Sequence, residues 1–259
     1  DGGQTFGANG DTYIKCAVWP DAHGTEALRD VIANSCNDAM MQMVRSIGPA
    51  NFAKYSREYG FGQKTGIDLP GEASTASLIF SEEQLAQTES NLAVSSFGQG
   101  FNVTMVQLAS SFCSLINGGD LYQPHVVKKV VDDSGNTVQE INPVVLKETV
   151  SKEVSDTLRD YMYTVVSEGT GAKAAVEGYA IGGKTGTAEK VPRGSGNYVV
   201  SFIGYAPVED PQVVVYVVVD VPHVEAQDHC SQSSFIAKNI FSQILPYMNI
   251  ERMDSVAAE

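Results

Sequence analysis

The sequence has few basic residues and no long apolar segment. Its 259 residues contain 17 Lys and Arg against 31 Asp and Glu, so the formal net charge is −14. Because a nucleic-acid-binding surface needs clustered Lys and Arg, this balance argues against a nucleic-acid partner. The most apolar run, residues 213–221, is far too short to cross a bilayer and is typical of a buried strand. Residues 1–16 have neither the basic nor the apolar region of a signal peptide, so we expect any membrane anchor to lie outside this sequence.

Cysteine is scarce and scattered, at Cys16, Cys36, Cys113 and Cys230. No two of these form a C-x-x-C pair, and none has a histidine at the usual metal-ligand spacing. The histidines share no common spacing and receive no role. The sequence therefore predicts reduced thiols, no metal site and no cofactor.

The helical part of the pattern comes first. No repeat or low-complexity linker interrupts the chain, which predicts one continuous domain over residues 1–259. We expect a helix from about residue 25, a break at 34–38, where helix-capping residues gather, and a new helix from Asn37 to Gly48. Pro49 suits the first turn of a further helix to about Tyr59. Capping boxes at Ser81/Gln84 and Thr104/Gln107 predict two more helix starts, and residues 151–168 predict a long helix.

The strand pattern lies mostly in the last third of the chain. Residues 125–141 alternate around Asp-Ser-Gly-Asn and predict a surface hairpin. Residues 178–188, 197–207 and 212–221 predict three strands, joined by connections so short that neighbours must be antiparallel. An amphipathic helix then closes the chain. Helices before and after an antiparallel sheet predict an α+β domain with helices packed on the sheet.

The run Lys184-Thr185-Gly186-Thr187 opens this meander and has two interpretations. Thr185 and Thr187 are two residues apart and share one face of a strand, while Lys184 points to the other face. A lysine, hydroxyls and backbone N–H groups at a strand edge would suit a carboxylate ligand or an oxyanion. The alternative is a glycine-rich strand end with a surface lysine. A second Lys-Thr-Gly at Lys64 is flanked by turn-forming residues and predicts only a loop.

Ser35 and Asn37 flank Cys36 at the predicted break between helices. A serine hydroxyl can pass a proton, and an asparagine amide can both donate to and accept from a peptide-like ligand. Helix capping by these residues is the alternative interpretation.

The two motifs together resemble those of the penicillin-binding protein transpeptidases, whose motif set is S-x-x-K, S-D-N and K-T-G. Ser35-x-Asn37 matches the second, and the lysine run that begins at Lys184 matches the third. Other segments resemble the class B, monofunctional branch, close to the division and sporulation enzymes. They include "SFGQGFNVTMVQLA", "LINGGDLYQPHVV", "EGTGAKAA" and "SFIGYAP", in the expected order over nearly the whole chain.

The resemblance implies roles for these residues. Family members cross-link peptidoglycan stem peptides through a serine acyl-enzyme formed at D-Ala-D-Ala, and penicillins acylate the same serine. Ser35 would relay a proton, the Asn37 amide would hold the substrate, and Lys184 would supply positive charge beside Ser35. The Thr185–Thr187 segment, Gly186 included, would bind the terminal carboxylate, with the Thr187 N–H as an oxyanion donor. The implied location is the outer face of the bacterial cytoplasmic membrane, with division or sporulation cell-wall machinery as partners.

One motif of the family is missing. No lysine in the sequence has a serine three residues before it, and Thr12-x-x-Lys15 lies in a polar segment with no helical pattern. The expectation is that the chain covers a C-terminal part of the domain, has no nucleophile and is inactive alone, with the edge of strand 213–221 exposed. A β-lactamase or β-lactam sensor of the same fold remains an alternative, as does a non-catalytic binding or scaffold partner.

Overall fold

The structure is a computed structural model that describes residues 2–7, 12–229 and 231–253. The chain divides into two compact units. The first unit comprises Asp1–Gln4, Lys15–Ala39 and Asp156–Glu259, and the second comprises Thr5–Ile14 and Met40–Ser155. The expectation of a single domain stays a prediction.

The first unit contains a three-stranded antiparallel sheet. Its strands are β7 (Gly182–Glu189), β8 (Tyr198–Ala206) and β9 (Val213–Asp220), in the order β7-β8-β9. The predicted meander is therefore confirmed, and the predicted α+β class with it. Within the described residues β7 and β9 are the two edges of this sheet, so the run 213–221 lies at an edge as expected.

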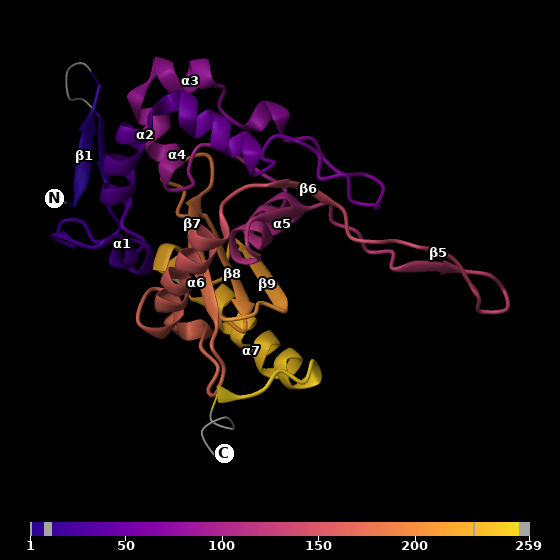
Figure 1. The fold of residues 1–259 in the computed structure, drawn as a ribbon. Helices are drawn as coiled ribbons and strands as arrows, with labels where there is room; N and C mark the ends of the chain where they lie inside the picture. Colours follow the sequence, from indigo (N-terminus) through magenta and orange to yellow (C-terminus); the bar gives the residue numbers. More distant parts are fainter. Residues whose placement is uncertain (1, 8–11, 230, 254–259) are drawn as a thin grey trace. The chain divides into compact units, whose positions relative to one another are not determined.

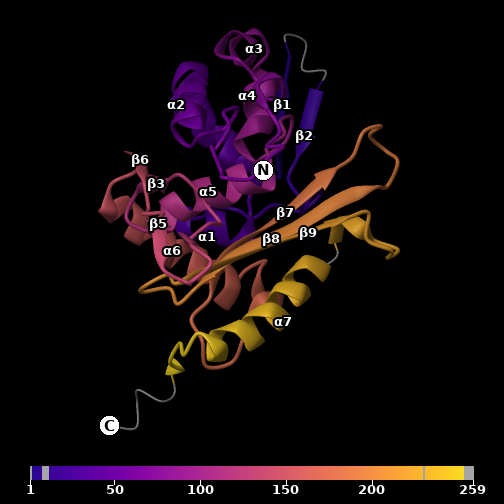
Figure 2. The same ribbon diagram turned by 90° about the vertical axis from the view of Figure 1, so that its right-hand side faces the viewer.

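Helix α7 (Gln232–Tyr247) covers one face of this sheet (Figure 2). Phe202 of β8 is fully buried there with Phe241 and Leu245 of α7. The other face receives α6 (Lys152–Ser167), because Tyr205, three residues along β8 from Phe202, donates a hydrogen bond of 2.8 Å to the carbonyl of Arg159. Successive side chains of β8 are thus buried on opposite faces of the sheet, which explains why the sequence of β8 is almost continuously apolar.

Helix α1 and the first residues of α2 also belong to the first unit. Helix α1 spans Leu28–Asn34, and α2 begins at Asn37 and runs to Glu58 in the second unit. Gly48 interrupts α2 with φ 76° and ψ 164°, and Pro49 follows. The predicted boundary between two helices at Gly48 and Pro49 is therefore confirmed as a non-helical residue within α2.

The second unit is built from short helices and two separate strand pairs. Both predicted capping boxes are present: Ser81 and Gln84 start α3 (Glu82–Gln87), and Thr104 and Gln107 start α5 (Met105–Ile116). The predicted surface hairpin is also confirmed, since Asp132 accepts hydrogen bonds of 2.9 Å from the backbone of Ser134 and Asn136. The remaining helix and strands are α4 (Glu89–Ser96), β1 (Gly3–Phe6), β2 (Thr12–Lys15), β3 (Asp120–Tyr122), β4 (Lys129–Val131), β5 (Thr137–Glu140) and β6 (Val145–Glu148). Figure 1 labels α4, β1, β5 and β6 among them.

Candidate active-site residues in the first unit

Ser35 is held at a sharp turn between α1 and α2. It adopts a left-handed conformation (φ 55°, ψ 46°), which a non-glycine residue adopts rarely. The N–H groups of Ser35 and Cys36 donate to the carbonyls of Ile32 and Val31, and these bonds close the last turn of α1. Asn37 then begins α2. The predicted break at 34–38 is confirmed, and the turn leaves the Ser35 side chain half-buried.

Lys184 reaches this turn from β7. Its Nζ donates to Ser35 Oγ at 2.7 Å and to the carbonyl of Thr185 at 3.2 Å. Desolvation lowers the pKa of Lys184 from 10.5 to about 8. The amine is therefore mostly charged at neutral pH, and it is poised to exchange a proton with the hydroxyl that it contacts. Lys184 is therefore half-buried and hydrogen-bonded rather than freely exposed, and its place in a ligand site stays a prediction.

Thr185 belongs to the opposite face of β7. In the ladder Lys184 pairs with Ile203 and Thr185 pairs with Phe202, so the two β7 side chains alternate as predicted. Thr185 Oγ1 lies 3.0 Å from Thr170 Oγ1. Thr187, two pairs further along β7 and opposite Val200, is exposed. Because β8 occupies only one side of β7 among the described residues, the other side of β7 presents backbone groups along an open edge.

Thr170 is a further candidate residue, which no sequence pattern singled out. Its N–H donates to the carbonyl of Ala33 at 3.1 Å, and its hydroxyl lies beside Thr185. Gly169 makes the approach possible, since a Cβ there would lie 2.4 Å from the Ala33 oxygen. The segment after α6 thus joins the end of α1 to β7. "EGTGAKAA" was the available signal, but only as part of the family resemblance.

The two glycines before Lys184 allow side chains of β8 to pack closely against β7. A Cβ at Gly182 would lie 2.4 Å from the Tyr205 ring, and one at Gly183 would lie 2.6 Å from Phe202 and 2.7 Å from the carbonyl oxygen of Ile203. Side chains of β8 therefore occupy the space that these glycines leave. At Gly186 the nearest atom is the Ser201 hydroxyl, at 2.6 Å.

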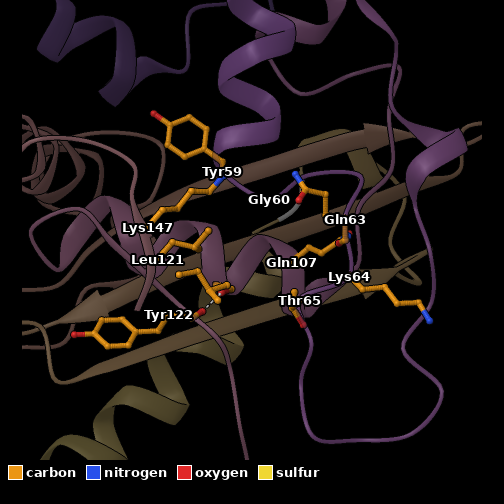
Figure 3. A pocket seen from close by; sticks show the side chains of 11 residues that line it. Tyr59, Gly60, Gln63, Lys64, Thr65, Gln107, Leu121, Tyr122 and Lys147 are labelled. Carbon is orange, nitrogen blue, oxygen red and sulfur yellow. Dashed lines mark hydrogen bonds between the residues drawn. The ribbon is translucent and has the colours of Figure 1, made fainter. Parts of the chain in front are cut away.

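The second Lys-Thr-Gly lies in a loop, as predicted. Glu72 accepts hydrogen bonds from the N–H and hydroxyl of Thr65, both at 2.6 Å, and from the N–H of Gly66 at 3.1 Å. Although partial burial opposes it, these bonds lower the pKa of Glu72. Lys64 and Thr65 line a pocket of about 270 Å³ in the second unit, together with Tyr59, Tyr122 and Lys147 among others (Figure 3). None of the predicted site residues lines this pocket.

Comparison with known proteins assigns the fold first. The structure superposes on penicillin-binding protein 3 of Mycobacterium tuberculosis, solved with aztreonam, with a TM-score of 0.84 at 26% identity, covering 97% of this chain and 57% of that one. A D,D-transpeptidase domain from Eggerthella lenta gives a TM-score of 0.82 at 25% identity, covering 96% of this chain and 59% of the other. The architecture is thus that of penicillin-binding transpeptidases.

Sequence comparison assigns the family. The model of the penicillin binding protein transpeptidase domain matches residues 5–245, and the chain belongs to this family, in its class B branch. It is 40% identical over 233 residues to the Stage V sporulation protein D of Bacillus subtilis, covering 88% of this chain and 35% of the relative. It is 32% identical over 230 residues to the penicillin-binding protein PbpB of Mycolicibacterium smegmatis, covering 84% of this chain and 34% of the relative. The chain therefore spans about a third of the length of these relatives. Within the described residues, no helix is both long and apolar enough to cross a membrane.

Proposed function

We propose that this chain supplies the substrate-binding and proton-transfer part of a D,D-transpeptidase site that cross-links peptidoglycan stem peptides and is acylated by β-lactams. The observation that carries the proposal is the 2.7 Å hydrogen bond from Lys184 Nζ to Ser35 Oγ. A hydroxyl in contact with a partly desolvated amine can accept a proton from one group and donate its own proton to another. Acyl transfer requires such a proton transfer both when the acyl-enzyme forms and when it is resolved.

The other roles follow the position of each residue. Asn37 starts α2 two residues after Ser35, where its amide would hold the peptide backbone of the substrate. Thr185, Gly186 and Thr187 lie along the open edge of β7, where hydroxyls and N–H groups would bind the terminal carboxylate and the oxyanion. Thr170 would position Thr185 through their contact at 3.0 Å.

The nucleophile must come from a Ser-x-x-Lys motif, which the 259 residues do not contain. We therefore expect the isolated chain to form no covalent penicilloyl adduct, as measured by intact-mass spectrometry. A stoichiometric adduct on this chain would contradict the proposal. In this proposal the protein acts on the outer face of the cytoplasmic membrane, held by an anchor outside these residues, with the division or sporulation machinery as its partner.

A fusion tests the activity directly. The chain is joined to the preceding transpeptidase segment of the Bacillus subtilis relative, which is 40% identical to it, and is incubated with a fluorescent penicillin. We expect stoichiometric acylation with product formation limited to one turnover. Sustained hydrolysis would favour a β-lactamase, and a folded fusion that is never acylated would favour a non-catalytic scaffold.

A further inference from the structure

Three side chains that could ligate a metal ion meet at the turn that contains Ser35 and Cys36. They come from the residue after β2, from the following loop and from the junction of α1 and α2: Cys16, His23 and Cys36. One ligand atom of each, the two sulfurs and a ring nitrogen, lies within 4.8 Å of the other two. All three residues belong to the first unit.

The spacing fits a tetrahedral metal ion. With metal–sulfur bonds of about 2.3 Å and metal–nitrogen bonds of about 2.0–2.1 Å, a sulfur and a nitrogen on one tetrahedral zinc ion lie about 3.6 Å apart. Cys16 Sγ and His23 Nδ1 are 3.7 Å apart. Both cysteines are buried and His23 is half-buried, so the ligands need little rearrangement and one side remains open to water.

The surroundings favour a cation. The Glu26 carboxylate lies in hydrogen-bonding contact with the Cys36 thiol and also accepts from Asn34 Nδ2 at 2.6 Å. A carboxylate beside the sulfur adds negative charge that a divalent cation would neutralise.

We propose that Cys16, His23 and Cys36 form a binding site for a divalent cation of the zinc class, with water or Glu26 in the fourth position. Imidazole and thiolate together select such borderline-soft ions over calcium or magnesium. Because Cys36 lies between Ser35 and Asn37, the ion ties the turn that carries both polar groups to the segment after β2. The site would stabilise the position of Ser35 without touching substrate.

Cobalt titration tests the proposal. The 259-residue chain with Cys113→Ser and Cys230→Ser is reduced, freed of reductant under nitrogen and titrated with Co²⁺. We expect one tetrahedral cobalt per chain, seen as visible d–d bands and thiolate-to-cobalt charge transfer, and displaced by Zn²⁺. Cys16→Ser or Cys36→Ser should abolish the charge-transfer spectrum or halve its sulfur contribution.

The His23→Gln variant guards against misfolding of the cysteine variants, because His23 is less buried. His23→Gln should weaken cobalt binding by at least 10- to 100-fold. That factor is typical of losing a group that only supports a metal ligand, so losing a ligand itself should cost no less. Binding unchanged in His23→Gln, or a thiolate-to-cobalt charge-transfer intensity unchanged in Cys16→Ser, would overturn the proposal. So would a chain whose Cys16 and Cys36 are joined in a disulfide that persists after reduction. None of these outcomes depends on transpeptidase activity.

Discussion

Lys184 and Ser35 are 149 residues apart in the chain, yet the lysine amine donates to the serine hydroxyl at 2.7 Å. The contact joins an edge strand to a left-handed turn between two helices. Each partner is fixed independently, Lys184 by its pairing with Ile203 and Ser35 by the closing bonds of α1. The pair is therefore arranged before any ligand arrives, as electrostatic preorganisation requires.

The first prediction concerns the hydroxyl. In the fusion described above, Ser35→Ala should lower the acylation rate by about 10²- to 10⁴-fold, the usual contribution of a positioned proton-transfer group. The rate is measured with a fluorescent penicillin. Ser242→Ala is the matched control, since Ser242 is an exposed residue of α7 whose hydroxyl donates only to the carbonyl of Asn239. Equal rates for the two variants would contradict the proton-relay role.

The second prediction concerns the charge of Lys184. The pKa of Lys184 is about 8 in the folded chain, against the ordinary lysine value of 10.5, which we take for the unfolded chain. Below pH 8 Lys184 is charged in both the folded and the unfolded chain, and the folded chain bears the full cost of desolvating this charge. Between pH 8 and 10.5 the unfolded state binds more protons, so this cost falls and the free energy of unfolding rises with pH.

Urea unfolding of the wild type and of Lys184→Met isolates this effect, because other titrations cancel in the difference. The wild type should gain about 1–3 kcal/mol relative to Lys184→Met between pH 8 and 10.5. A difference that does not change with pH would mean that Lys184 titrates normally.

The third prediction concerns the glycines of β7. Gly183→Ala should destabilise the chain by about 1–3 kcal/mol, because the added Cβ would meet the Phe202 ring and the Ile203 carbonyl. Gly186→Ala should cost less, since only the Ser201 hydroxyl is in the way and it can rotate. Adding Ser201→Ala should relieve Gly186→Ala but not Gly183→Ala, as measured by urea unfolding.

The fourth prediction compares the two capping boxes. Gln107 is buried; its oxygen accepts from Thr75 Oγ1 at 3.0 Å and from the N–H of Thr104 at 2.9 Å, and its nitrogen donates to the Gln63 carbonyl. Gln107→Ala leaves these buried partners without a hydrogen bond and should lower the free energy of unfolding by about 2–4 kcal/mol in total. Gln84→Ala leaves exposed groups that water can satisfy, and should cost under about 1 kcal/mol. Equal losses would mean that burial does not matter here.

Local chemistry made much of the fold predictable. The capping boxes, the Asp132 turn, the non-helical Gly48 and the short strand connections each depend on residues close in sequence, so the pattern carries their geometry. The division into two compact units was not predicted, because the first unit is assembled from three separate stretches and no linker composition marks the borders.

The candidate site was only partly predictable, for the same physical reason. Ser35 and Lys184 were paired through the family resemblance, since no local pattern links residues so far apart. Thr170 was missed because its role depends on contacts with Ala33 and Thr185. The grouping of Cys16 and His23 with Cys36 follows from the turn after α1, and their spacing in sequence gives no sign of it.

The second unit's main stretch, Met40–Ser155, is inserted between the part of the chain that carries Ser35 and the part that carries Lys184. The exposed hairpin turn at Asp132–Asn136 lies inside this insertion, where a protease would find an accessible loop tip. A single cut there would leave the serine and the lysine on different polypeptides. The site would then behave as a split protein, whose reassembly depends on the concentration of both pieces.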